Sequence, residues 1–182
     1  MIPIGYLNNT EEGLAGEPGL FYDYILAGNG LFIRAENPLL RATVQIAGAD
    51  VRGLVPIMEK VELRKGKIPW YIYGLALSTF LADRSRESYI AVTWEEGYRF
   101  RTPPQIADGC SVRYERLPST VLDFHSHGII EAFFSTTDNE DEQGLCLFMV
   151  AGELDRLVPG LKLRIGVYGY FRPVKLYEVF DV

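Results

Sequence analysis

The chain has only two histidines, and they lie two residues apart in His125-Ser126-His127. On a β-strand, residues i and i+2 point to the same face, with Cα atoms about 7 Å apart, so both imidazoles can converge on one metal ion. Ser135 and Asp138 complete the string His-x-His-x7-Ser-x2-Asp. Two imidazoles and one carboxylate leave a fourth tetrahedral position for water, which is typical of catalytic zinc sites. The spacing therefore predicts zinc (Zn2+) ligands at His125, His127 and Asp138.

Each fragment of this string also has an ordinary structural explanation. A His-x-His pair by itself is more often a surface or core pair than a pair of metal ligands. The Ser135-x-x-Asp138 spacing is typical of a helix N-terminus, and the acidic run at residues 138–142 favours a helix start as well. The explanations are compatible, because a strand with both histidines, a loop and a helix start with Asp138 would bring three ligands together.

The complete string resembles the JAMM (MPN+) signature of the JAB1/MPN/Mov34 metalloprotease superfamily. Within the superfamily, the resemblance is to the prokaryotic JAB branch. Its members are zinc-dependent peptidases and isopeptidases whose best-known substrates are ubiquitin and ubiquitin-like conjugates. The family places a glutamate between its long helix and a hydrophobic strand. Glu87 matches that position, because residues 88–94 form a predicted strand, whereas the alternatives Glu95 and Glu96 follow this strand.

The JAMM resemblance covers residues 65–182 and departs from the family at Gly128, where many members have proline. That departure affects the rigidity of a loop and removes no ligand. A narrower resemblance, to the protein A family of bacterial PRTRC cassettes, covers nearly the whole chain through residues 22–30 and 125–144. These cassettes also encode a ubiquitin-like protein and an E1-like (ThiF-related) protein. The resemblance thus implies a ubiquitin-like protein or its conjugates, and E1-like and E2-like proteins, as partners.

The resemblance also implies roles for individual residues. Glu87 would take a proton from the zinc-activated water and return it to the leaving amine, and Ser135 would hydrogen-bond the oxyanion. Asp123 lies on the strand face of the histidines and is a candidate partner for one of them, although acidic strand residues are more often simply solvated. Residues 131–155 carry seven acidic residues and no Lys or Arg, which indicates a solvated rim or a field that attracts cations and basic partners.

The elements that must position these residues form a mixed α/β (α+β) chain. We expect a JAMM/cytidine-deaminase-like mixed sheet packed by a long helix, with a β-rich N-terminal elaboration at residues 1–65 and the metalloprotease domain at residues 66–182. Pro69 favours a helix start, so the long helix is predicted to run from there to about Arg84. Residues 1–19, rich in Gly, Asn, Glu and Pro, are predicted to be a loop or arm. Strands are predicted at residues 20–26, 31–34, 42–46, 61–63, 88–94, 98–101, 112–115, 120–127, 145–151, 161–170 and 176–180.

Composition limits the class of protein. With 182 residues, 48% hydrophobic, the chain can bury the core of one domain with an elaboration, and its net charge of −6 argues against direct nucleic-acid binding. Cys110 and Cys146 form no metal knuckle and are expected to be two core thiols. No signal peptide is expected, because the first residues have neither a basic start nor a following apolar block, and the longest uncharged stretch, residues 68–82, is short for a membrane span. A soluble, cytoplasmic protein is expected.

Three other functions compete with the peptidase. A non-catalytic MPN scaffold, within a ubiquitin-like or PRTRC-type complex, usually lacks metal ligands that are all present here. A cytidine deaminase would need a His/Cys-x-Glu and a Pro-Cys-x-x-Cys motif, and the chain has neither. A RadC-like role in DNA metabolism is disfavoured by the negative charge.

Overall fold

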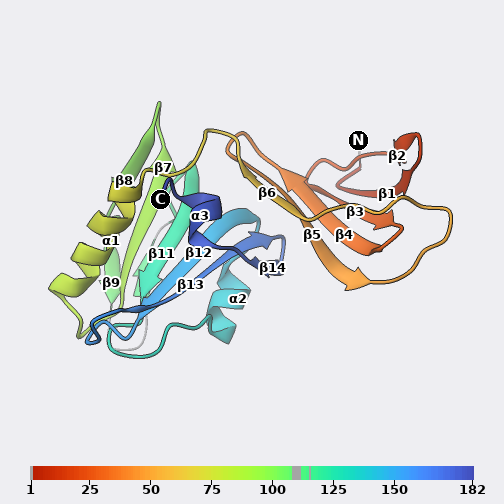
Figure 1. The fold of residues 1–182 in the computed structure, drawn as a ribbon. Helices are drawn as coiled ribbons and strands as arrows, with labels where there is room; N and C mark the ends of the chain where they lie inside the picture. Colours follow the sequence, from red (N-terminus) through yellow and green to blue (C-terminus); the bar gives the residue numbers. More distant parts are fainter. Residues whose placement is uncertain (1, 108–111, 115) are drawn as a thin grey trace.

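The computed structural model describes residues 2–107, 112–114 and 116–182. The part of the chain so described is a mixed α+β fold with two six-stranded sheets, a two-stranded ribbon and three short helices (Figure 1). Among these helices, none is long and apolar enough to cross a membrane. Of the two cysteines, Cys146 is fully buried as expected, whereas Cys110 lies outside the described residues.

The N-terminal sheet has the strand order β2-β1-β3-β4-β5-β6. Its strands are β1 (Ile4–Thr10), β2 (Gly13–Ala15), β3 (Tyr22–Ala27), β4 (Gly30–Glu36), β5 (Leu40–Gly48) and β6 (Lys60–Leu63). β1 runs parallel to β3, and the other neighbours are antiparallel. The strands predicted at residues 20–26 and 31–34 are confirmed as β3 and β4, which pair as an antiparallel hairpin.

The prediction of a loop at residues 1–19 is wrong for most of the segment, which contains β1 and β2. Leu7 is buried in a small core with Ile25 and Phe32. Gly5 lies so close to β3 that an added Cβ would be 2.1 Å from Asp23 Oδ1. The glycine here permits close approach of a neighbouring strand, a function that composition alone does not distinguish from a loop.

The second sheet has the order β14-β13-β12-β11-β7-β8, and β11 and β12 form its one parallel pair among the described strands. Its strands are β7 (Ser88–Trp94), β8 (Tyr98–Arg101), β11 (Thr120–Ser126), β12 (Leu145–Gly152), β13 (Gly160–Val167) and β14 (Tyr170–Pro173). The ribbon consists of β9 (Gln105–Ala107) and β10 (Val112–Tyr114), and the helices are α1 (Trp70–Ala82), α2 (Thr136–Asp141) and α3 (Leu176–Val179).

The expected long helix is a helix of 13 residues, α1, which ends at Ala82 rather than near Arg84. Asp83 has extended backbone angles, φ −140° and ψ 92°, so it cannot continue the helix. Its carboxylate accepts hydrogen bonds from Ser85 N and from the Arg86 guanidinium. These bonds stabilise a turn in place of a last helical turn.

Two strand predictions near the C-terminus are wrong. The strand expected over residues 161–170 is two strands, β13 and β14, joined at Tyr168 and Gly169, whose φ angles are 48° and 89°. Two successive positive φ angles are typical of a tight hairpin turn. The strand expected at residues 176–180 is the short helix α3, which is stabilised because Glu178 Oε2 accepts a hydrogen bond from Lys175 N.

The two faces of the second sheet have different partners. On one face, Phe124 of β11 packs edge-to-face on Phe80 of α1, with ring centroids 4.9 Å apart. The N-terminal sheet packs on this face too, where the Tyr24 and Tyr170 hydroxyls lie 3.2 Å apart. Neighbouring strand residues alternate between faces, so His125 points to the opposite face, where α2 lies (Figure 1). The sheet thus separates the main core from the predicted metal ligands.

Candidate metal centre

The two histidines lie at the end of the central strand β11. Both are buried, His125 at 5% and His127 at 8% exposure. β11 ends at Ser126, but His127 N donates to Ala151 O at 2.7 Å and so extends the pairing with β12. The strand alternation therefore includes both imidazoles, whose Nε2 atoms lie 3.2 Å apart. The structure brings the two predicted ligands together on one face.

Asp138 approaches the histidines from α2. Ser135 is the N-cap of that helix: its hydroxyl accepts from Asp138 N at 3.1 Å, while its own N and Oγ donate to Asp138 Oδ2 at 2.6 and 2.7 Å. The other carboxylate oxygen, Oδ1, lies 3.7 Å from His125 Nε2. The helix cap and the ligand position predicted for Asp138 are thus both present, on different oxygens.

The donor set fits a metal ion. One ligand atom from each of His125, His127 and Asp138 lies within 4.8 Å of the other two. Ligand atoms bound at 2.0–2.2 Å with tetrahedral angles would be about 3.3 Å apart. The distances of 3.2 and 3.7 Å around His125 Nε2 are close to that value. Imidazole and carboxylate ligands suit zinc as well as other divalent transition metals.

The surroundings of both histidines favour an imidazole with a free lone pair, which a metal ligand needs. His127 Nδ1 lies 3.3 Å from the carbonyl oxygen of Glu131, which can only accept, so the proton resides on Nδ1 and the Nε2 lone pair is available. Burial lowers the pKa of His125 to about 4, against the opposing attraction of Asp138. At neutral pH the His125 imidazole is therefore uncharged and can donate a lone pair.

Glu87, the predicted general base, immediately precedes β7. The antiparallel register aligns Ser88 with Ser126 and Tyr89 with His125. One step further along the same register, Glu87 comes opposite His127 and on the same face, since opposed residues of antiparallel strands share a face. The side chain is partly buried. Its place in the register is consistent with the role expected from the sequence.

The alternative glutamates lie at the opposite end of β7. Glu95 follows Trp94, the last residue of that strand, and its carboxylate bonds Arg101 and the Thr93 hydroxyl. At about 3.3 Å per residue, Glu95 is roughly 20 Å along the strand from the histidine end. Glu96 has a left-handed backbone, φ 56°, in the adjoining turn. Neither is brought to the metal ligands.

Two other predicted residues have partners that bear on their roles. The hydroxyl hydrogen of Ser135 is directed to Asp138 Oδ2, so donation to an oxyanion would require the hydroxyl to rotate away. Asp123 is 4% exposed on the face of the histidines. Burial is the main cause that raises the pKa of Tyr89 and of Cys146, and the negative charge of Asp123 adds to it, which places Asp123 in a buried polar group beside the predicted metal ligands.

The sequence analysis missed a second set of residues around α2. Arg164, in the middle of β13, has a buried side chain that hydrogen-bonds Asn139 and Glu142. Burial raises the pKa of Glu142, and the Arg164 guanidinium opposes that effect. One signal was available in the sequence: Arg164 lies between Leu163 and Ile165, at a strand position flanked by core residues. A charged side chain that is buried at such a position requires a partner.

A cavity of about 520 Å³ adjoins His127, one of the predicted metal ligands. Its walls come from the loop before Glu87 and from the loop after β11, and they are mainly apolar; the lining residues are Arg84, Ser85, Arg86, His127, Gly128, Ile129 and Ile130. Ile129 and Ile130 are 63% and 49% exposed. An extended chain could therefore lie against apolar surface within reach of His127.

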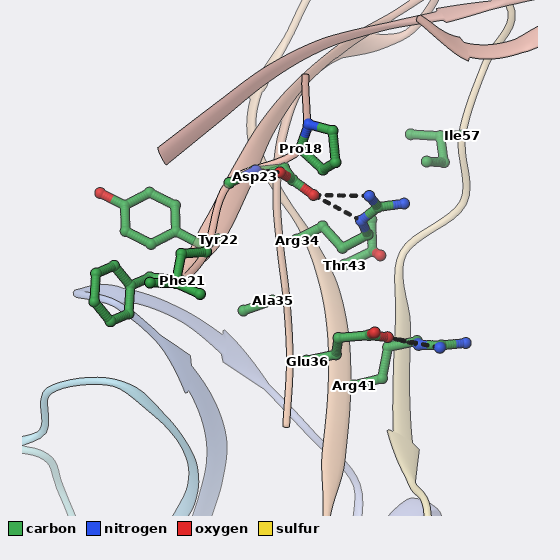
Figure 2. A pocket seen from close by; sticks show the side chains of 12 residues that line it. Pro18, Phe21, Tyr22, Asp23, Arg34, Ala35, Glu36, Arg41, Thr43 and Ile57 are labelled. Atoms are coloured by element: carbon green, nitrogen blue, oxygen red, sulfur yellow. Dashed lines mark hydrogen bonds and ion pairs between the residues drawn. The ribbon is translucent and has the colours of Figure 1, made fainter. Parts of the chain in front are cut away.

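Another cavity, of about 480 Å³, lies on the N-terminal sheet (Figure 2). Figure 2 shows the charged side chains of this cavity pointing toward one another in two pairs. Asp23 Oδ2 lies 2.7 Å from Arg34 Nη2, and Glu36 Oε2 lies 2.6 Å from Arg41 Nη2. These four charges neutralise one another, and the cavity has no histidine or cysteine in its lining. Of these two cavities, the one beside His127 is therefore the one that fits the metal chemistry expected from the sequence.

No model of a known protein family matches the chain, and no curated protein matches it either.

Proposed function

We propose that this protein is a zinc-dependent peptidase or isopeptidase that cleaves at the C-terminus of a ubiquitin-like protein, either to process a precursor or to release a conjugate. The observation that carries the proposal is the convergence of His125, His127 and Asp138, with the two Nε2 atoms 3.2 Å apart. Three protein ligands leave one position of a tetrahedral site open, as catalysis requires. The likeness of the string to the JAMM signature supports the same reaction.

In the proposed mechanism, His125, His127 and Asp138 hold the zinc ion. Zinc bound there would supply Lewis acidity that lowers the pKa of water toward neutrality. The Glu87 carboxylate accepts the proton of the attacking water, and the same carboxyl group then donates it to the nitrogen of the leaving amine as the C–N bond breaks. Ser135 is assigned to the oxyanion, which requires its hydroxyl to turn from Asp138 Oδ2 toward the substrate.

The substrate class is supported by the cavity beside His127. Its apolar wall, with Ile129 and Ile130 exposed, suits an extended apolar segment leading to the scissile bond. Arg84 and Arg86 border the same cavity. The C-terminal tail of a ubiquitin-like protein is such an extended segment, and the PRTRC resemblance supports that choice, with E1-like and E2-like proteins as further proposed partners.

Cleavage of a ubiquitin-like protein carrying a C-terminal extension tests the proposal. The zinc-loaded wild type is expected to cut after the ubiquitin-like domain, and chelation is expected to abolish the cut. Glu87→Gln is expected to bind one zinc ion and lose activity by about 10²–10⁴-fold. Glu95→Gln, at the other end of β7, is the matched control and should retain activity. A wild type that binds no zinc, or equal activity of the two variants, would contradict the mechanism.

The alternative function is a non-catalytic scaffold in a ubiquitin-like or PRTRC-type complex. It is favoured by the outer face of α1, where Tyr71, Leu75 and Leu81 are 62%, 46% and 40% exposed. Exposed apolar residues gathered on one helix face are typical of protein interaction surfaces. Zinc binding without cleavage of any ubiquitin-like substrate would support this alternative.

A further inference from the structure

The face of the second sheet that carries the histidines also carries Arg164. Its position on β13 is opposite Phe148 of β12, which is itself opposite Asp123 of β11. The Arg164 side chain is only 9% exposed. Its guanidinium carbon lies 3.6 Å from the centroid of the Phe134 ring and 3.8 Å from that of Phe171. The cation is thus stacked between two aromatic rings.

The same guanidinium hydrogen-bonds two residues of the α2 region. Nη1 donates to Asn139 Oδ1 at 2.7 Å, and Nε donates to Glu142 Oε2 at 2.8 Å, with Nη2 also bonded to that oxygen. Asn139 lies within α2, and Glu142 is its C-cap residue. All three nitrogen atoms of the Arg164 guanidinium therefore hydrogen-bond residues of α2 or of its C-cap.

These contacts span the segment that carries the site residues. Phe134 precedes the N-cap Ser135, and Glu142 ends α2, so Arg164 contacts the segment at both ends, with Asp138 between them. α2 has six residues, and none of those within its bounds is buried. A helix of this length is not stable by itself, so its position must come from tertiary contacts.

We propose that Arg164 is a positioning residue for the metal ligand Asp138. Through its bonds to Asn139 and Glu142, it fixes α2 against β13 and so holds the Asp138 carboxylate where Oδ1 faces His125 Nε2. The inference rests on the metal-binding part of the proposed function and is independent of whether the protein is a peptidase. Without the contacts of Arg164, all three ligand side chains are still present, but Asp138 is no longer held near His125 and His127.

Zinc affinity measured by competition with a chromophoric chelator tests the proposal. Arg164→Met is expected to weaken zinc binding by about 10- to 100-fold, the range typical of residues that orient metal ligands. Because that variant leaves Glu142 without its cation, the double variant Arg164→Met/Glu142→Leu, which removes both charges, is measured beside it. The control is Arg34→Met, which breaks the Arg34–Asp23 ion pair of the N-terminal sheet, shown in Figure 2. Its zinc affinity should stay within about threefold of wild type.

Two further readouts distinguish positioning from simple charge neutralisation. Arg164→Lys keeps the positive charge but lacks the planar guanidinium that hydrogen-bonds Asn139 and Glu142 together. It should therefore restore the free energy of unfolding more fully than it restores the zinc affinity. The visible spectrum of the Co2+-substituted protein, which reports coordination geometry, is expected to change in Arg164→Met in the same direction as in Asp138→Ala. Full recovery of affinity by lysine, or an unchanged affinity and spectrum in both Arg164→Met variants, would overturn the inference. Absence of zinc binding by the wild type would instead overturn the proposed function.

Discussion

Ser135 and Asp138 form a reciprocal pair at the start of α2: each side chain accepts a hydrogen bond from the other residue's backbone N–H. The pair uses only one carboxylate oxygen, Oδ2, and leaves Oδ1 facing His125. A side chain fixed by a cap has few rotamers left to lose when it binds a metal. The cap therefore holds the Asp138 carboxylate in the orientation that the proposed metal site requires.

Replacement of Ser135 by alanine should affect both stability and metal binding. The loss of an N-cap hydroxyl is expected to lower the free energy of unfolding by about 1 kcal/mol. The freed Asp138 carboxylate should bind zinc about tenfold more weakly. Urea unfolding and chelator competition measure the two effects, and Ser135→Thr, which keeps a capping hydroxyl, is the control. Wild-type zinc affinity in Ser135→Ala would show that the cap does not orient the ligand.

Metal removal should lower the stability of the folded protein. An ion that binds only the folded chain, present at 100 times its dissociation constant, adds about 2.7 kcal/mol to the free energy of unfolding. Denaturant unfolding with zinc and with EDTA should show this difference in the wild type. In His127→Ala the two curves should coincide, and a persistent zinc effect there would place the ion elsewhere.

Gly128 and Gly74 should respond oppositely to alanine. Gly128 has φ +60°, and a Cβ there would lie 2.6 Å from the Arg84 carbonyl oxygen, so Gly128→Ala should lose about 1–3 kcal/mol of stability. Gly74 lies in α1 with no atom within 4 Å of an added Cβ, so Gly74→Ala should gain about 0.4–1 kcal/mol. Thermal unfolding of both variants measures the contrast. A neutral Gly128→Ala would mean that the loop after His127 can move away from Arg84.

Stability should decline at alkaline pH. Burial raises the pKa of Cys146 and of Tyr98 to about 12, and burial together with the charge of Asp123 raises the pKa of Tyr89. In the unfolded chain these groups lose their protons near pH 8.5–10. The folded state therefore binds more protons above about pH 9, and the free energy of unfolding falls as the pH rises toward 12.

Urea unfolding across pH 8–11 measures this decline. Cys146→Ala, which removes one of the three groups, should show a shallower decline than the wild type. An equal slope in the two proteins would show that the thiol is not kept protonated by the fold.

The sequence predicted the parts of the site that depend on local spacing. His125 and His127 share a face because strand periodicity is two, and Asp138 starts a helix because Ser135 caps it. The resemblance adds Glu87, whose position in the register agrees with that assignment. By contrast, the pairing of Arg164 with Glu142 joins residues 22 positions apart, and no local pattern specifies it.

The errors in the fold have a similar origin. β1 was not predicted because its buried face depends on a parallel neighbour, β3, that is not adjacent in the chain. The turn at Tyr168 and Gly169 was overlooked because apolar residues continue through it. The residues of α3 have no strong helical pattern, and its start depends on the bond between Glu178 and Lys175 N.

The parallel pairing of β11 with β12 has a consequence for the order of folding. Adjacent parallel strands need a crossover connection, and residues 127–144, with α2 among them, provide it. The histidines lie where the chain leaves β11, and Asp138 lies within the crossover itself. Any ion held by the three would tie the crossover to the strand from which it departs, and it would do so only in the folded chain, where the three side chains lie together. Because Arg164 of β13 holds α2, the three side chains can come together only after this crossover has packed against the sheet.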